Sequence, residues 1–500
     1  MGLRIVCTGL GLLLAATLQA DTLFRAASIV DGSGAQPYTA DLRVRGTRIA
    51  AIGALQPATT DTIIDAQGLV LAPGFIDPHS HHDEYLERLP DAAAAVSQGI
   101  TTIVVGVDGE SIHPFRDRLP QPVAVNLASF SGHGTLRRAV LGEDYRRLAS
   151  ATEVARMQQL LQADMDAGAL GLSTGLEYDP GIYSATAEIV ALARTAAAAG
   201  GIYASHMRSE DVKLDEAIDE LATIARAAKI PAHVSHLKLA LIDRWGKAGT
   251  VLEKLDALRA EGLDITADAY PYTYWHSSLT VLFPARDFSD MEAARQALLH
   301  STPAAGLRLS RYQPEPRFVG MTLEQIAAER NEAPEITLLW LINRAYPDGN
   351  LDAAEDVEAV MGTSMREDDV AAILAWPHTS VCSDGALEDG HPRGAGAFTR
   401  YLRDHVLNRE PADLAAGIHR MTGKSATQMR IRDRGRIGIG RYADLVLFDP
   451  HTVRDRADLD NPGALSTGMH GVWVNGERVW DGSRSTGALP GQIVTRDTVL

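Results

Sequence analysis

The feature that most constrains the fold is a repeated alternation of short apolar runs with longer helix-like stretches in the middle of the chain. Eight runs of strand length follow one another, at Phe75–His79, Thr101–Val105, Val123–Ala128, Leu170–Ser173, Ile202–His206, Ala232–His236, Ile265–Ala269 and Thr379–Ser383. Helical stretches separate most of them, for example Thr152–Ala167, Ala185–Ala199, Asp215–Ala228 and Val251–Glu261. Parallel strands need such crossovers. The sequence therefore predicts an α/β fold, a (β/α)₈ TIM barrel over residues 74–434.

The interval between the seventh and eighth runs is longer than 100 residues. It contains two helical stretches of its own, Leu323–Glu329 and Ile336–Arg344. A structureless loop of that length is uncommon in a compact domain. We therefore expect an inserted subdomain or lid at about residues 284–370.

The two ends of the chain share a different pattern. From Thr22 to Leu71, short apolar runs are broken by Gly and Asp, and the same pattern returns at Ala443–Phe448 and Val472–Gly476. Alternation bounded by turn residues indicates β-strands. We expect residues 21–73 and 435–500 to pair into one small β-sandwich domain.

The first twenty residues resemble a secretory signal peptide. A basic start at Arg4 precedes a mostly apolar run from Ile5 to Leu18, and Ala20 is a small residue at the expected cut. The alternative is a membrane anchor, but the run is shorter than the roughly 20 residues that a spanning helix needs. The sequence predicts a signal peptide at 1–20, a periplasmic or secreted protein, and no stable membrane insertion after cleavage.

The net charge limits the kinds of molecule that the protein can bind, and the cysteine content limits its disulfide bonds. The net charge of −17 argues against a nucleic acid or an anionic membrane as partner. A few local cations can still hold a small anionic substrate. Cleavage would remove Cys7 and leave Cys382 without an intramolecular partner, so we expect no internal disulfide.

Metal-binding side chains follow the predicted strands. In this barrel type the active site lies at the C-terminal ends of the strands. His79 and His81 end the first strand, and side chains two apart on a strand point the same way. The other candidates at this rim are Asp108, His206, His236 and Asp384. Imidazole and carboxylate groups suit Zn²⁺ and other divalent ions, so the sequence predicts a centre of one or two metals.

Several motifs resemble those of a known family. Pro73-Gly-Phe-Ile-Asp-Pro-His-Ser-His81 follows a β-rich N-terminus, and Ser383-Asp-Gly385 follows the last strand. Finer motifs are Gly132–Arg137, Gly168–Leu176, His206–Glu210, Asp268–Thr273, His391–Arg393 and Gly440–Val446. Together they resemble the amidohydrolase superfamily and, within it, the D-aminoacylase (N-acyl-D-amino-acid deacylase) family, over nearly the whole mature chain.

The resemblance implies roles for the metal candidates. His79 and His81 match the ligands of a weakly held metal, and His206 and His236 match those of a tightly held one. Asp384 matches the catalytic aspartate, which takes a proton from the attacking water and passes it to the leaving nitrogen.

The resemblance also implies residues that contact the substrate. Lys238, Tyr178 and Arg393 match residues that hold the substrate's α-carboxylate. His133 lies just past the third predicted strand, where it either contacts substrate or supports a tight glycine loop. Trp275, next to two further aromatic residues, either lines a side-chain pocket or packs within the insert.

Three positions depart from the family pattern or stay ambiguous. Asp108 stands where the family has a metal-binding cysteine, and a carboxylate there can bridge two metals. His82 stands where the family often has Asp, and its role is structural or functional. Cys382 shares the strand face of Asp384, but a small buried apolar cysteine is commoner than a ligand.

The expected function is metal-dependent hydrolysis of N-acyl-D-amino acids, which releases a D-amino acid and a carboxylic acid. The expected partner is such a molecule or a short peptide. A dipeptidase acting on a substrate with a free α-carboxylate is an alternative. A cyclic-amide hydrolase often uses a carboxylated lysine, and no lysine stands near Asp108. A non-catalytic binding protein would have lost some of the six metal candidates.

Overall fold

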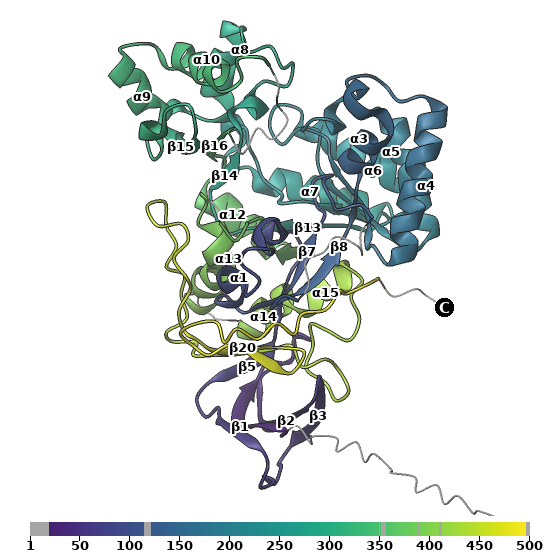
Figure 1. Ribbon diagram of the computed structural model, residues 1–500, viewed down its shortest axis with the longest axis vertical. Helices are drawn as coiled ribbons and strands as arrows, with labels where there is room; N and C mark the ends of the chain where they lie inside the picture. Colours follow the sequence, from purple (N-terminus) through teal and green to yellow (C-terminus); the bar gives the residue numbers. More distant parts are fainter. Residues whose placement is uncertain are drawn as a thin grey trace, which may run out of the picture.

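The computed structural model describes residues 20–114, 122–349, 351, 357–388, 390–409 and 413–496. The predicted signal peptide, apart from Ala20, lies outside these ranges, so the structure does not bear on it. No helix in the described ranges is both long and apolar enough to cross a membrane. Figure 1 shows the barrel in the middle, a β domain at one end and an inserted subdomain at the other.

The predicted parallel barrel is confirmed. Its eight strands within the described residues are β6 (Phe75–Asp77), β7 (Ile100–Val105), β8 (Asn126–Ser129), β10 (Gly171–Gly175), β11 (Ile202–His206), β12 (Ala232–Val234), β13 (Ile265–Ala269) and β17 (Thr379–Val381). Neighbouring strands pair in parallel, and β9 (Ser131–Gly132) continues β8 to reach β10. The segments that directly follow the first and last strands meet where the Asp384 amide donates to the His79 carbonyl at 2.9 Å. The ring of strands is thus closed next to predicted site residues.

Helices cover the outside of the barrel (Figure 1). They include α1 (Ala93–Val96), α3 (His133–Leu141), α4 (Ala151–Ala167), α5 (Thr186–Ala198), α6 (Leu214–Ala228), α7 (Ala248–Ala260), α12 (Glu367–Ala375), α13 (Arg393–Tyr401), α14 (Leu414–Met421) and α15 (Gly423–Gln428). Helix α4 shows how the sequence sets these limits. Ser150 and Glu153 form a reciprocal capping box at its start, and Gly168 ends it with φ 105°.

Both ends of the chain contribute to one sheet. Its strand order is β20-β19-β18-β5-β1-β2-β3, and β4 pairs with β1. The ranges are β1 (Thr22–Ile29), β2 (Tyr38–Arg45), β3 (Arg48–Gly53), β4 (Thr62–Asp65), β5 (Val70–Pro73), β18 (Leu445–Phe448), β19 (Met469–Val474) and β20 (Glu477–Trp480). Strand β18 faces two cores at once, because Leu445 and Leu447 pack inside the β domain while Val446 and Phe448 pack on the barrel.

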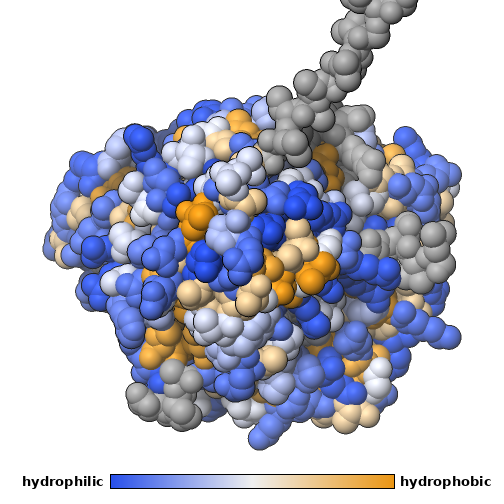
Figure 2. All heavy atoms as spheres, turned by 90° about the horizontal axis from the view of Figure 1, so that it is seen from below, coloured by the Kyte–Doolittle hydropathy of each residue, from blue (hydrophilic) through white to orange (hydrophobic). Residues whose placement is uncertain are grey.

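The last described residues leave this domain, although the sequence assigns them to it. The amides of Gly491 and Val494 donate to backbone carbonyls of the segment that leads into and forms β8, and the Arg496 amide donates to the Gly168 carbonyl at 2.9 Å. The face in Figure 2 is mostly hydrophilic, and its apolar side chains lie in small separate groups. Scattered apolar residues of this kind are common on the surface of folded proteins, so the described part of this face gives no sign of a binding site.

The long interval before β17 forms a subdomain with its own apolar core. Strands β14 (Tyr274–Ser277), β15 (Leu307–Tyr312) and β16 (Glu358–Thr363) form an antiparallel sheet, accompanied by helices α8 (Met291–Gln296), α9 (Leu323–Arg330) and α10 (Pro334–Ala345). The insert therefore starts nearer residue 274 than the expected 284. Its sheet ends at Thr363, and α12 already packs on the barrel.

Candidate metal centre

A cavity of about 590 Å³ lies where the strand ends of the barrel meet the insert. That size is typical of a small-molecule site. The predicted site residues that line it are His81, Asp108, Tyr178, His206, His236, Lys238, Asp384 and Arg393. The insert contributes Trp275, His276 and Ser277 from β14. Trp275 both lines the cavity and packs against the core of the insert, so each of its two expected positions is confirmed.

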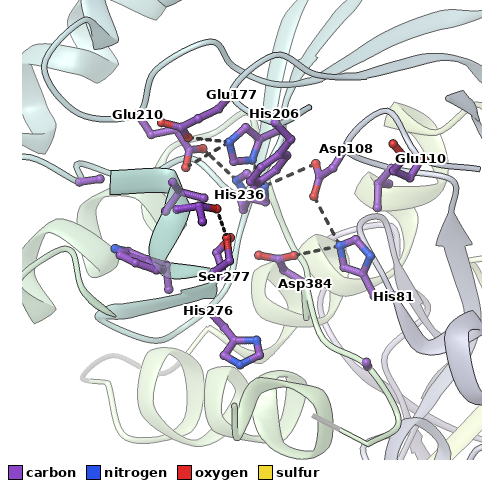
Figure 3. Close-up of a pocket in the computed structure, with 18 of the residues that line it drawn as sticks. His81, Asp108, Glu110, Glu177, His206, Glu210, His236, His276, Ser277 and Asp384 are labelled. Atoms are coloured by element: carbon purple, nitrogen blue, oxygen red, sulfur yellow. Dashed lines mark hydrogen bonds and ion pairs between the residues drawn. The ribbon is translucent and has the colours of Figure 1, made fainter. Parts of the chain in front are cut away.

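The first group of ligand atoms surrounds one oxygen of Asp108 (Figure 3). Asp108 Oδ2 lies 3.1 Å from Nε2 of His79 and 3.4 Å from Nε2 of His81. Asp384 Oδ1 lies 3.4 Å from each of the same two nitrogens. The strand itself ends at Asp77, so the prediction of a strand through His79 is wrong. The two rings still reach the same pair of carboxylates.

The second group lies at the other oxygen of Asp108. Its Oδ1 is 3.5 Å from Nε2 of His236, which in turn is 3.0 Å from Nδ1 of His206. His206 ends β11, and His236 comes two residues after β12. Asp108 therefore presents one oxygen to each group, as a bridging ligand would.

The donor set fits divalent ions. Oδ1 of Asp108 is buried and has no hydrogen-bond partner among the described residues, which is costly unless something else binds it. Burial would raise the pKa of Asp108, but His79 and His236 more than reverse this and hold it well below its usual range. The ionised carboxylate is the form that binds a cation.

Three of these residues have strained backbones. Asp108, His236 and Asp384 adopt φ values of 52°, 34° and 51°, a left-handed region that non-glycine residues seldom occupy. Asp268 helps to hold one of them, because its Oδ1 accepts the His236 amide at 2.6 Å. Such strain clusters at functional sites, where the surroundings over-determine the conformation.

Glu210 could complete a different metal group with His206 and His236. Its side chain, however, already binds a cation. Lys238 Nζ lies 2.6 Å from Glu210 Oε2 and 2.7 Å from Nδ1 of His236. Burial would lower the pKa of Lys238, but the Glu210 carboxylate outweighs burial and raises it. A charged ammonium on this side repels a metal ion, so Nε2 of His236, which faces Asp108, and the neighbouring Nδ1 of His206 form the better metal side.

The three predicted carboxylate-binding residues surround this centre. Lys238 is buried on the Glu210 side, and Arg393 donates to Asp384 Oδ2. The Tyr178 ring lies with its centroid 4.4 Å from that of His206. Two cations and a phenol thus flank the candidate metal centre in an otherwise acid-rich cavity.

His133 does not reach the cavity, so the prediction that it contacts substrate is wrong. It is the first residue of α3, its side chain is fully buried, and its Nε2 lies 2.8 Å from Glu188 Oε1. Arg137 Nη1 donates to the same carboxylate at 2.6 Å. The ring faces the packing between α3 and α5, where it holds a buried charge network together.

His82 and Cys382 are also structural. The His82 ring is buried between the Ser80 hydroxyl at 2.7 Å and the Gly394 carbonyl at 2.9 Å, which ties the first strand end to α13. Cys382 is fully buried, and burial raises the pKa of its thiol well above the usual range. A neutral thiol is not the ligand form of cysteine.

Sequence reasoning missed two carboxylates. Glu177 follows β10 by two residues, and its Oε2 lies 2.9 Å from Nε2 of His206. Glu210 lies four residues after His206, in the loop that follows β11. Glu210 ends the motif His206–Glu210 and Glu177 directly follows the motif Gly168–Leu176, but neither residue ends a strand. Figure 3 shows both carboxylates on the outer side of the two histidines.

A family model described as the amidohydrolase family matches residues 62–480. The chain belongs to the amidohydrolase family. It is 35% identical to D-aminoacylase from Alcaligenes xylosoxydans xylosoxydans, over 95% of this chain and 98% of that one. It is 36% identical to N-acyl-D-aspartate deacylase from the same organism, over 96% of each. The expected resemblance to D-aminoacylases is thereby confirmed.

Solved structures agree with the sequences. A crystal structure of D-aminoacylase superposes with a TM-score of 0.82 at 33% identity, covering 95% of this chain and 99% of that one. N-acyl-D-glutamate deacylase from Bordetella bronchiseptica, complexed with zinc and a phosphonate inhibitor, gives the same TM-score and identity over 95% of this chain and 100% of that one. The likeness therefore includes the barrel, the β domain and the insert together.

Proposed function

We propose that the protein is a zinc-dependent deacylase of N-acyl-D-amino acids. The observation that carries the proposal is the division of Asp108 between two groups of ligand atoms, with two cations beside them in one cavity. Relatives named as deacylases of N-acyl-D-amino acids, one of them complexed with zinc, support the substrate class and the metal.

His79, His81 and Asp384 would hold one ion, His206 and His236 the other, and Asp108 would bridge them. When bound, zinc polarises the scissile carbonyl and lowers the pKa of a water molecule. Asp384 accepts the proton of the attacking water and delivers it to the amide nitrogen. The water oxygen first bonds to the carbonyl carbon; the C–N bond then breaks as the nitrogen takes up the proton, which releases a carboxylic acid and a free amine.

Lys238 and Arg393 would bind the α-carboxylate, and Tyr178 would add a hydroxyl donor. Both cations already have carboxylate partners, Glu210 and Asp384, which hold them in place at the cavity wall. Because Arg393 contacts Asp384, the substrate's carboxylate would lie close to the proton-transferring group. That geometry suits an amide one carbon away from the carboxylate.

A dipeptidase activity is the second candidate. The cavity wall also carries Glu84, Glu110, Asp211 and Glu388, which could bind the ammonium group of an N-terminal residue. A dipeptide with a D-configured C-terminal residue presents the same α-carboxylate as an N-acyl-D-amino acid. The two substrate classes differ only in the acyl group, which carries a free ammonium in a dipeptide.

Initial rates on N-acetyl amino acids of both configurations, with dipeptides and hydantoins alongside, test the proposal in zinc-supplemented buffer. We expect hydrolysis of the N-acetyl-D forms and its loss in a His206→Ala variant. Preferred cleavage of the L forms would refute the stereochemical assignment, and preferred cleavage of dipeptides would favour the second candidate.

We also propose that residues 1–20 are a signal peptide and that the protein acts in the periplasm or outside the cell. The basic start, apolar run and small residue at position 20 support this. N-terminal sequencing of the purified protein, together with cell fractionation, tests it: an uncut N-terminus would refute cleavage.

A further inference from the structure

His206 and His236 each have one ring nitrogen on the side of the candidate metal site and one on the far side. The two residues differ in the partner of the nitrogen on the far side. His236 presents its Nδ1 to the Lys238 ammonium at 2.7 Å, with Glu210 Oε1 at 3.0 Å. His206 presents its Nε2 to Glu177 at 2.9 Å, while Glu210 Oε2 lies farther away, at 3.9 Å. An ionised carboxylate accepts hydrogen bonds and donates none, so the His206 ring is the donor in this contact.

That contact decides which nitrogen of His206 carries the proton. A neutral imidazole has one N–H and one lone pair. If Nε2 donates its hydrogen to Glu177, Nδ1 keeps its lone pair, and Nδ1 is the nitrogen that lies 3.0 Å from Nε2 of His236. Metal-binding histidines commonly donate their other N–H to such an outer carboxylate, which also raises the basicity of the ligand.

The structure holds Glu177 rigidly enough for this task. The amide of Leu176, its neighbour, donates to the His206 carbonyl at 3.1 Å. Arg286 of the insert donates to the Glu177 carbonyl at 2.9 Å. The Glu177 side chain is 15% exposed. The backbone that carries this side chain is thus bonded to the end of β11 on one side and to the insert on the other.

We infer that Glu177 is a positioning residue, which fixes the orientation and tautomer of His206 so that Nδ1 binds the zinc ion. The inference rests on the zinc site of the proposed function. Glu177, which is not itself a ligand, would thus contribute to the affinity for the metal. Because Arg286 holds the same segment, the insert would support the metal centre as well as cover the cavity.

Zinc affinity of the metal-free full-length protein, measured by competition with a chromophoric chelator, tests the inference without substrate. The variants are Glu177→Leu, which removes the acceptor, and Glu177→Gln, which keeps an oxygen but loses the charge. Glu110→Leu is the matched control, because Glu110 also lines the cavity but contacts Thr135 and Arg138 rather than a histidine.

We expect Glu177→Leu to weaken binding of the tighter zinc ion about 10- to 100-fold. Glu177→Gln should fall in between, and Glu110→Leu should match the wild type. The d–d absorption of the Co²⁺-loaded protein should change in Glu177→Leu only. The melting temperature of the metal-free variants should stay at the wild-type value, since the contact acts through the metal.

Two results would overturn the inference. One is zinc affinity within about twofold of wild type in both Glu177 variants, a difference too small for a lost outer carboxylate. The other is weakened affinity that merely follows a lower melting temperature of the metal-free protein. A wild-type protein that binds no zinc would instead refute the proposed function itself.

Discussion

The buried network around Arg137 gives the sharpest test of the corrected role of His133. Arg137 is fully buried, its Nη1 donates to both oxygens of Glu188 at 2.6 Å, and His133 contacts the same carboxylate. Glu188→Gln removes the negative charge with little change of shape. It leaves the Arg137 charge uncompensated inside the protein.

Breaking a buried pair by removing one partner costs about 3–5 kcal/mol, because the remaining charge stays desolvated. The free energy of unfolding of a protein is commonly only about 5–15 kcal/mol, so the expected loss is a large part of it and easily measured. The surface pair Arg226–Glu261 is a matched control, at 2.7 Å but with both side chains more than half exposed. Glu261→Gln should cost less than about 1 kcal/mol.

Urea unfolding followed by tryptophan fluorescence measures both variants, and KM for an N-acetyl-D-amino acid is measured in parallel. We expect Glu188→Gln to lower the free energy of unfolding while KM stays within about twofold of wild type, as it should when no binding contact is lost. A variant of wild-type stability with a strongly raised KM would refute the reasoning. That result would indicate that His133 and Glu188 contact the substrate after all.

Three further predictions concern the metal centre and the effect of pH. Asp384→Asn should lower kcat about 10²- to 10⁴-fold by removing the proton acceptor, while calorimetry with Zn²⁺ should still detect the tighter ion; an unchanged kcat would contradict this. Asp108→Asn should reduce the bound zinc, measured by atomic absorption, from two ions per chain to one, whereas wild-type protein with a single ion and no change in the variant would exclude the bridge. Burial lowers the pKa of His405 to about 4 from 6.5, so the unfolded state takes up a proton first as pH falls. Above pH 6.5, His405 is neutral in both the folded and the unfolded state and costs no stability. As pH falls from 6.5 toward 4, protonation of the unfolded state lowers the free energy of unfolding by about 3 kcal/mol. His405→Gln should therefore lose less stability than wild type over that range in urea titrations, and equal losses would contradict the sign.

The barrel could be predicted because its sequence pattern is local. Runs such as 202–206 and 265–269 coincide with β11 and β13, and predicted helices agree with observed ones to within about three residues. The first strand was placed two residues too far, because the apolar pattern continues through Pro78 while strand pairing stops at Asp77. Alternation says where a strand is favoured but not where its hydrogen bonds stop.

Side-chain direction beyond the strand ends was harder to predict. His133 follows β9 directly, but it begins a helix, and its ring turns toward a glutamate of α5 that the sequence does not mark as buried. Glu177 lies in a loop after β10, and nothing in its spacing links it to His206. Both positions depend on how loops fold back, which periodicity does not encode.

The bonding of β5 to β18 has a consequence for synthesis and folding. Strand β5 pairs on one side with β1, which precedes it closely, and on the other with β18, beginning at Leu445. Chains are made at about 5–20 residues per second, so that edge stays without its partner while the whole barrel is made. An apolar edge strand left open is a site for pairing with other chains. Truncations before Phe448 should therefore aggregate rather than yield a smaller folded barrel.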